Sequence, residues 1–344
     1  MKKSIFFICL ILLGCQKEIT LNLPQAKSKL VVEGSIEPNF PPFVILTKNQ
    51  GYFEPIDIST YNNLFVNDVD SVKVWFYDDN GQKETKILKQ VPGLDELPPI
   101  YTDIDYINSL LSGDTIPYDF SKEGRTYFLE IKWNNEIITS QTRIPEPTPL
   151  DCLWVEKSET ATKDFKYDIR AIYSDPGEIQ NHILIKSKRI EHWKRDSIDG
   201  EIKNDYDERL ILVDAGSDVL INGESFETYF PRPKEEGGFP SGAYNTDHYK
   251  IFDNNGTEDT IFLSHDIVLI KFCQIDESSV KFWRGVVRQS TTNNNPFSEP
   301  LNLVSNINNG LGGWTGYGAS YYKIPIRENE VIKKEFEPKI GDIF

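Results

Sequence analysis

Short hydrophobic runs separated by turn residues make up most of this chain after residue 29, and they restrict it to a β-rich fold. Two clear runs are 72–77, which leads into Asp78-Asp79-Asn80-Gly81, and 127–133, which is followed by Asn134-Asn135. Asparagine and glycine in such turns favour hairpins because they readily adopt positive φ. Strands at this spacing with few helices indicate a β-sandwich. Aromatic residues make up 12% of the chain, whereas methionine occurs only at position 1, and this balance favours strands over helical bundles.

Length and proline placement predict two domains. About 330 residues remain once an N-terminal signal is removed, and single cores stop growing near roughly 250–300 residues. Pro145, Pro147 and Pro149 hold the chain extended and cannot continue a strand ladder. We therefore expect a mainly β protein, with an immunoglobulin-like β-sandwich over residues 29–146 and a second β-rich domain over residues 147–344.

One segment of the second domain has the spacing of a helix. Residues 279–289 carry apolar side chains at helical intervals, and Asp276 or Ser278 can cap the start. This pattern predicts one amphipathic helix packed on the second sheet. A shorter helix is expected near residues 106–111, and the charged stretch 191–208 is expected to be a solvated loop or a long hairpin.

The first fifteen residues have the pattern of a lipoprotein signal. Two lysines precede a short apolar run, and Gly14 stands directly before Cys15. The apolar run has about half of the roughly 20 residues that a membrane-spanning helix needs. The segment resembles a bacterial lipobox, in which the cysteine thiol is acylated and becomes the new N-terminus. We expect residues 1–14 to be a signal peptide, Cys15 to be the lipidation site and residues 15–28 to be a tether.

The acidity of the chain argues against partners that are themselves negatively charged. Removing Lys2 and Lys3 with the signal leaves 35 of the 37 Lys and Arg against 53 Asp and Glu, a formal charge of −18. Nucleic acids and anionic lipid surfaces are bound through positive patches. We therefore expect no nucleic-acid partner, and we expect membrane attachment to occur through the N-terminal lipid.

Residues that carry chemistry in other proteins occur here without the partners that this chemistry needs. Ser264-His265-Asp266 contains the residue types of a hydrolase triad, but neighbours on a strand point to opposite faces and cannot converge. His182, His192 and His248 have no partner at zinc-binding spacing. The acidic turn 253–259 has its glycine at the wrong position for a calcium-binding loop. We therefore expect no catalytic residue, no metal site and no cofactor.

The glycine run 310–318 is interpreted as structural. It lacks the Gly-Lys-Ser/Thr of a phosphate-binding loop, and its glycines would let backbones approach closely. Trp314 and Tyr317 within this run have two interpretations, packing in a core or contact with a ligand or partner. Cys152 and Cys273 form one candidate disulfide pair, although each lies in an apolar run where free cysteine packs as a small hydrophobic residue.

A motif near the C-terminus supports a family resemblance. It runs Ser305-Asn306-Ile307-Asn308-Asn309-Gly310-Leu311-Gly312-Gly313-Trp314-Thr315-Gly316-Tyr317. This motif resembles the closing signature of an uncharacterised Bacteroidota lipoprotein family, catalogued as domain of unknown function 4249. Leu30-Val31-Val32-Glu33-Gly34 resembles the opening strand of that family, and Trp314 stands where many members have phenylalanine. The resemblance implies an outer-membrane lipoprotein that is often paired with a TonB-dependent receptor, and it brings no catalytic residue.

These features predict a non-enzymatic accessory lipoprotein of the outer membrane that cooperates with a TonB-dependent β-barrel importer in nutrient capture. The importer is implied by the resemblance alone. The alternative is a structural or adhesive surface lipoprotein, and a lipid-anchored hydrolase is a third hypothesis.

Lipidation gives the first testable prediction. Acyl chains contribute roughly 0.8 kcal/mol per buried CH₂, so several chains hold a protein almost irreversibly to a membrane. Cys15→Ala is expected to leave the precursor unprocessed by the lipoprotein signal peptidase. Mass spectrometry of the wild-type N-terminus is expected to find an acylated Cys15, and an unmodified cysteine there would contradict the predicted localisation.

Overall fold

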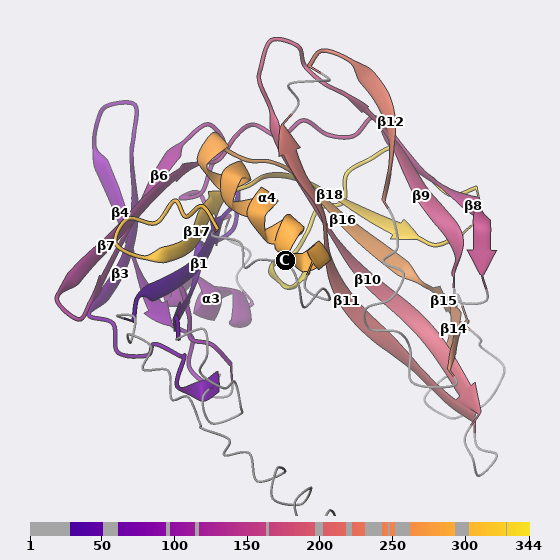
Figure 1. Ribbon diagram of the computed structural model, residues 1–344, viewed down its shortest axis with the longest axis horizontal. Coiled ribbons are helices and arrows are strands. Elements are labelled where there is room, and N and C mark those ends of the chain that lie inside the picture. Colours follow the sequence, from indigo (N-terminus) through magenta and orange to yellow (C-terminus); the bar gives the residue numbers. More distant parts are fainter. Residues whose placement is uncertain are drawn as a thin grey trace, which may run out of the picture.

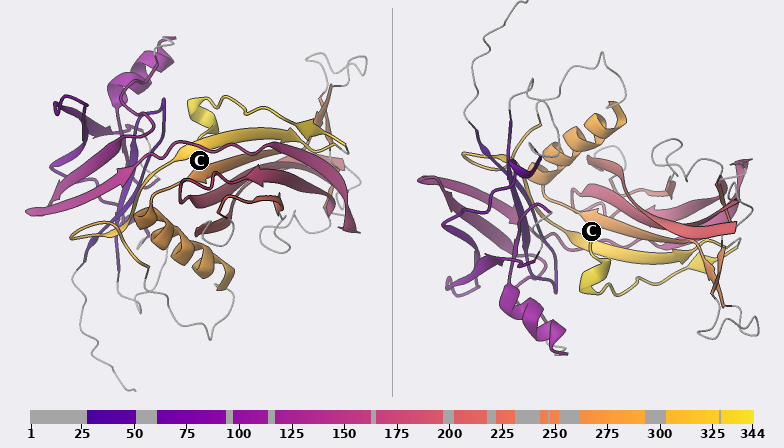
Figure 2. Two further views of the ribbon diagram at one scale, coloured as in Figure 1. Left: turned by 90° about the horizontal axis from the view of Figure 1, so that it is seen from above. Right: turned by 90° about the horizontal axis from the view of Figure 1, so that it is seen from below.

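The computed structural model describes residues 28–50, 61–93, 97–113, 117–162, 165–196, 202–217, 222–230, 243–246, 248–251, 262–292, 303–327 and 329–344. The chain is mainly β, as the sequence predicts, and two β-rich halves meet beside helix α4 (Figures 1 and 2). Within the described residues, no helix has both the length and the apolar character needed to cross a bilayer.

The first half is a large, nearly closed sheet of eight strands, in the order β17-β1-β2-β5-β4-β3-β6-β7. The strands are β1 (Leu30–Ile36), β2 (Phe43–Lys48), β3 (Ser71–Tyr77), β4 (Lys83–Gln90), β5 (Ile100–Thr102), β6 (Thr126–Trp133), β7 (Glu136–Arg143) and β17 (Leu311–Gly316). Neighbours run antiparallel except β1 and β17, which are parallel. Alternate residues of β1 point into one core, because side chains on a strand alternate between its two faces.

Local sequence signals account for the turns of this half. Asn134 and Asn135 connect β6 to β7 with φ of 50° and 59°, and Gly81 lies between β3 and β4 with φ of 75°. Both predicted hairpins are therefore confirmed. The short helix expected near residues 106–111 is α3 (Ile104–Leu111), and Asp103 caps it by accepting a hydrogen bond from the Tyr106 amide.

The second half contains two antiparallel sheets packed face to face. One has the order β11-β10-β16-β18 and the other β12-β9-β8-β19, while β13 pairs with β10 and β14 pairs with β15. Apolar side chains of β16 and β18, such as Phe272 and Tyr322, meet those of β8 and β9, such as Leu153 and Ile169, in one core. The strands are β8 (Cys152–Thr162), β9 (Phe165–Ser174), β10 (His182–Asp196), β11 (Ile202–Ser217), β12 (Ser225–Phe230), β13 (Tyr244–Asn245), β14 (His248–Ile251), β15 (Phe262–His265), β16 (Ile267–Gln274), β18 (Gly318–Pro325) and β19 (Val331–Ile332).

The charged stretch 191–208 belongs to a long hairpin, which was one of its two expected forms. The hairpin consists of β10 and β11, paired from His182 with Ser217 to Asp196 with Ile202. Glu191 and His192 lie on it and are buried, so this part of the hairpin is not a solvated loop.

The predicted amphipathic helix is α4 (Glu277–Thr292). It covers the face of the β11-β10-β16-β18 sheet that points away from the other sheet of the second half. Val280, Trp283 and Val287 pack against a small core that includes Leu184 and Cys273. The chain closes with the short 3₁₀ helix η1 (Ile340–Asp342), whose Ile340 lines a cavity together with Phe282 and Trp283 of α4.

Strand β17 brings the chain back to the first half. In the sequence it follows every strand of the second half except β18 and β19. Its Trp314 lies opposite Gly34 of β1 and is completely buried in the first core. A Cβ atom on Gly34 would lie 2.6 Å from Cε3 of the Trp314 indole. The indole can therefore pack directly against the backbone of β1 only because residue 34 is glycine. Residues 311–316, which the sequence assigns to the segment 147–344, therefore complete the sheet built by residues 30–143.

The glycine run 310–318 brings backbones together, as the sequence suggests. A Cβ atom on Gly316 would meet the main-chain oxygen of Arg143, the last residue of β7. The amide of Gly316 also donates a 2.8 Å hydrogen bond to Oγ1 of Thr142. β17 and β7, the two outer strands of the sheet, therefore contact each other, and the sheet is nearly closed.

The packing of Trp314 predicts a large loss of stability when it is truncated. Trp314→Ala is expected to lower the free energy of unfolding by about 3–5 kcal/mol, because it removes buried apolar surface and leaves a cavity. Urea unfolding measures this change. Gly34→Ala is expected to cost about 1–3 kcal/mol through overpacking against the same ring. Gly216→Ala is the matched control, because no described atom outside its chain neighbours lies within 4 Å of the added Cβ. An unchanged unfolding midpoint for Trp314→Ala would show that this residue is not part of a packed core.

Candidate functional site

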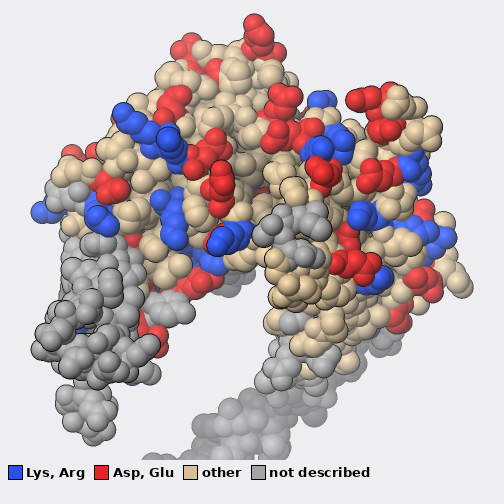
Figure 3. All heavy atoms as spheres, turned by 180° about the vertical axis from the view of Figure 1, so that it is seen from behind, with Lys and Arg blue, Asp and Glu red and all other residues tan. Residues whose placement is uncertain are grey.

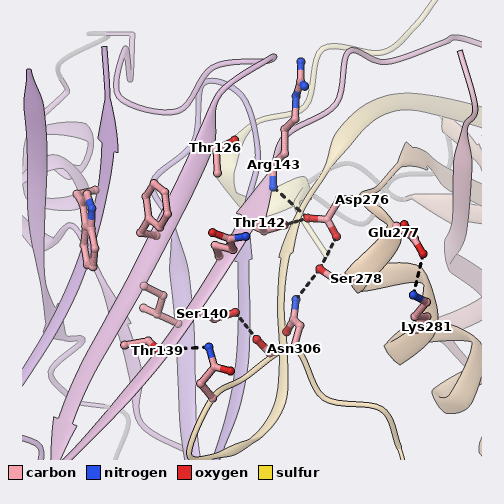
Figure 4. A pocket seen from close by; sticks show the side chains of 15 residues that line it. Thr126, Thr139, Ser140, Thr142, Arg143, Asp276, Glu277, Ser278, Lys281 and Asn306 are labelled. Atoms are coloured by element: carbon pink, nitrogen blue, oxygen red, sulfur yellow. Dashed lines mark hydrogen bonds and ion pairs between the residues drawn. The ribbon is translucent and has the colours of Figure 1, made fainter. Parts of the chain in front are cut away.

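A groove of about 910 Å³ lies between the edge of the first sheet, formed by β6 and β7, and the start of α4 (Figure 4). Its walls are mostly neutral side chains that donate and accept hydrogen bonds. From β6 and β7 these are Thr126, Thr139, Ser140, Gln141 and Thr142, and from the segments on the other side they are Ser278, Asn306 and Asn308.

Asp276 is the central carboxylate of the groove, and it joins the two halves of the molecule. One of its oxygens accepts hydrogen bonds from the Thr142 hydroxyl at 2.6 Å and the Arg143 amide at 3.0 Å. The other accepts from the Ser278 hydroxyl at 2.7 Å and the Ser279 amide at 2.8 Å. The Ser279 bond caps α4, as the sequence predicts, whereas the bonds to β7 were not foreseen.

These hydrogen bonds set the ionisation of Asp276. Burial by itself would raise the pKa of this carboxyl, but the four donors stabilise the charged form and hold the pKa below its ordinary value. With two donors on each oxygen, the carboxylate has little capacity left to act as a base or to ligate a metal ion.

Asn306 fixes the opposite wall of the groove. Its side-chain oxygen accepts from the Trp314 amide at 2.9 Å, and its side-chain nitrogen donates to the Trp314 carbonyl at 2.7 Å. The Ser140 hydroxyl donates to the main-chain oxygen of Asn306 at 2.8 Å. Asn306 therefore acts as a strand partner for β17 and holds its own segment against β7. Its position in the motif 305–317 was the only signal in the sequence that pointed to it.

Aromatic and charged side chains complete the lining. The rings of Trp75 and Phe128 stack with centroids 5.6 Å apart and an interplanar angle of 16°. The Lys83 ammonium lies 4.0 Å from the centroid of the Trp75 ring, so the ring has neighbours on both faces. Glu277, which is exposed, forms a 2.7 Å ion pair with Lys281.

The two aromatic residues singled out in the sequence lie outside this groove. Trp314 is in the first core, and Tyr317 is buried between α4 and the second sheet, where it lines a separate cavity. The predicted lipidation site Cys15 and the acidic turn 253–259 lie outside the described residues.

The remaining chemical candidates are not assembled into a reactive centre by the described residues. Asp266 is buried and accepts a 2.8 Å hydrogen bond from the main-chain amide of His192, whose Nδ1 also lies 2.8 Å from the same oxygen. Cys152 and Cys273 are both free, and burial raises the pKa of the Cys273 thiol to about 12. Among the described residues, no group of three or more His, Cys, Asp or Glu side chains could hold a metal ion.

The fold and the groove define a two-part, mainly β protein with a polar surface groove at the junction of its halves. The chain matches the family described as "Domain of unknown function (DUF4249)" over residues 16–322, and it belongs to that family. The resemblance expected from the motif 305–317 is thereby confirmed. No curated protein matches the chain.

The hydrogen bonds of Asp276 predict a pH-dependent loss of stability. Asp276→Asn places an amide nitrogen against at least one existing donor, and it is expected to cost about 1–3 kcal/mol at pH 7. Because the folded-state pKa of Asp276 is lowered, its contribution is complete above the unfolded value of about 4 and disappears as the pH falls through the folded value.

Urea unfolding of both proteins at neutral and acidic pH tests this prediction. The difference in stability between wild type and Asp276→Asn is expected to shrink on acidification. Glu277→Gln is the matched control, since this neighbouring carboxylate is exposed and pairs only with Lys281 among the interactions described, and its removal is expected to change stability very little. Equal effects of the two substitutions would argue against a link from Asp276 to β7.

Proposed function

We propose that this protein is a non-enzymatic, lipid-anchored accessory protein of the outer membrane that binds a ligand or partner in the groove for a TonB-dependent β-barrel importer. The observation that carries the binding role is the groove itself. It is lined largely by neutral hydroxyl and amide side chains, and convergent polar groups in a concavity are the features that orient a ligand and give specificity.

The state of the groove carboxylates supports binding over catalysis. A general base needs a free oxygen within reach of the proton it removes. Both oxygens of Asp276 already accept hydrogen bonds, and Glu277 is engaged with Lys281. A groove with this chemistry suits reversible recognition of hydrogen-bonding groups.

The place where the tether enters supports an anchored orientation. Ser28 and Lys29 lie in a depression together with Asn135 and Asn309, at the β6–β7 turn. From that end β7 rises about 3.4 Å per residue toward Arg143, which lines the groove. A lipid on Cys15 would therefore hold the protein by the end of the first sheet that carries the β6–β7 turn, and Arg143 in the groove lies at the other end of β7.

The surface charge supports a protein or small-molecule partner over a polyanion. Acidic and basic side chains are interspersed over the face shown in Figure 3. Positive patches of the kind that bind nucleic acid are not expected at a formal charge of −16. The importer as the partner rests on the family resemblance, which is an associational argument.

We also infer an immunoglobulin-like class for the first half. Strand order supports this class, because β1-β2-β5-β4 and β3-β6-β7 follow the ABED and CFG orders of a constant-type domain. Tyr127 near the start of β6 gives further support. Its hydroxyl donates a 2.8 Å hydrogen bond to the main-chain oxygen of Phe120, as in the tyrosine corner of such domains.

Affinity purification tests the proposed partnership. Tagged wild-type protein is cross-linked in intact cells, purified from solubilised outer membranes, and its partners are identified by mass spectrometry. A TonB-dependent barrel is expected to co-purify. The double variant Gln141→Ala/Arg143→Ala, which alters exposed groove side chains, is expected to recover it at least about tenfold less well, since interface anchors contribute about 1.4 kcal/mol or more.

Matched substitutions on another face separate this effect from a general one. Ile87→Ala/Lys89→Ala lies beside α3 and is expected to recover the barrel as the wild type does. Recovery of no barrel by the wild type would contradict the importer role and favour a structural or adhesive surface protein. Equal recovery of the barrel by both double variants would show that the groove does not contact the barrel.

A further inference from the structure

A second cavity, of about 290 Å³, lies at the junction of the two halves and is separate from the groove. Glu33 and Ser35 of β1 and Lys186 of β10 line part of it. The other walls are mostly apolar and come mainly from β2, α4 and the C-terminal segment. They include Phe43, Ile45, Phe282, Trp283, Ile343 and Phe344. The volume is near the lower end of the roughly 300–1,000 Å³ that is usual for ligand pockets.

Two lysines stand side by side at this junction. Lys186 of β10 is directly paired with Lys271 of β16 in the strand register. Like charges in this arrangement destabilise a sheet, and the effect grows as the side chains leave water. The pair therefore needs negative partners.

Lys271 has hydrogen-bond acceptors for its ammonium group, and one of them is a carboxylate. It is 1% exposed, and its ammonium donates to Oε1 of Glu37 at 3.0 Å and to the main-chain oxygen of Phe344 at 2.9 Å. The other oxygen of Glu37 accepts a 2.7 Å hydrogen bond from the Tyr321 hydroxyl. Glu37 is thus fully engaged by Lys271 and Tyr321.

Lys186 differs from its neighbour because it lines the cavity without a carboxylate partner among the residues that the structure describes. Its ammonium lies 3.4 Å from the Tyr317 hydroxyl, 4.5 Å from the centroid of the Trp283 ring and 5.1 Å from that of the Tyr317 ring. Within the described part of the chain, no carboxylate forms an ion pair with Lys186. Burial and the nearby Lys271 charge lower the pKa of Lys186 to about 8. An ammonium in such a place is stabilised by an added anion.

We propose that this cavity binds a small carboxylic acid with an apolar body, whose carboxylate pairs with the Lys186 ammonium while the body packs against Trp283 and Phe282. The acid is expected to carry a single charge. Glu33 also lines the cavity and Glu37 lies beside Lys271, so a phosphate ester or another multiply charged anion meets repulsion there.

A matched pair of probes tests the charge requirement. Binding of 3-phenylpropionate and of the uncharged 3-phenylpropan-1-ol to the full-length protein is measured by calorimetry at pH 7. The acid is expected to bind with a Kd of about 1 mM or tighter, and the alcohol at least about tenfold more weakly. Quenching of Trp283 fluorescence gives a second readout, and it is expected to be lost in Trp283→Phe.

Substitution of the lysine tests the assigned partner. Lys186→Met is expected to weaken binding of the acid by at least about tenfold and to leave the alcohol unaffected. Lys188→Gln is the matched control, because this lysine lies two residues away on β10 and forms its own ion pair with Glu208. Thermal melting confirms that each variant is folded, and Lys186→Gln replaces the methionine variant if that variant unfolds.

The pH profile separates an ion pair from simple apolar binding. The titratable and charged groups facing Lys186 from the neighbouring elements are Lys271, Cys273, Glu33, Glu37 and Tyr317. Burial raises the pKa of Cys273 to about 12 and that of Tyr317 well above its ordinary value, so neither gains charge near neutral pH. Affinity for the acid is therefore expected to fall as the pH rises above about 8, while affinity for the alcohol stays constant.

Three results would each overturn the proposal. They are failure of the acid to bind, equal binding of acid and alcohol, and an unchanged affinity for the acid in the Lys186 variants. None of these measurements involves the groove or an importer, so they are independent of the proposed function.

Discussion

The parallel pairing of β17 with β1 is the constraint on which the rest of the molecule depends. It joins residues about 280 positions apart, and the loop-closure entropy of such a contact has to be offset by the packing it creates. Trp314 on Gly34 supplies that packing, with the indole fully buried. The first sheet is therefore completed only when the chain has passed through most of the second half, and the stability of the two halves is coupled.

The junction between the halves is held by charged groups in well-defined hydrogen bonds. Asp276 joins the cap of α4 to β7, and Lys271 with Glu37 joins β16 to the segment after β1. Such pairs add little net stability because desolvation offsets their attraction, but breaking one leaves a charge unsatisfied. Their effect is to favour one relative orientation of the halves, and this orientation forms both the groove and the cavity.

The groove and the cavity differ in chemistry although they lie at the same junction. In the groove the carboxylates are already engaged and most of the polar side chains are neutral, which suits recognition through directional hydrogen bonds. In the cavity Lys186 is held by aromatic rings and lacks an ionic partner among the described residues, which suits a single negative charge. Tyr317, noticed in the sequence for its position beside the glycine run, lines the cavity.

The sequence by itself determined the features that depend on neighbouring residues. Asn134-Asn135 specified a hairpin because asparagine tolerates positive φ, and Asp276 specified the start of α4 because a carboxylate can satisfy a free amide there. Only the tertiary structure decided that β17 belongs to the first sheet and that Asp276 also binds Thr142. It alone decided that Lys186 faces Lys271. These contacts join residues that are far apart in the chain, and their energies come from burial and closure that periodicity does not encode.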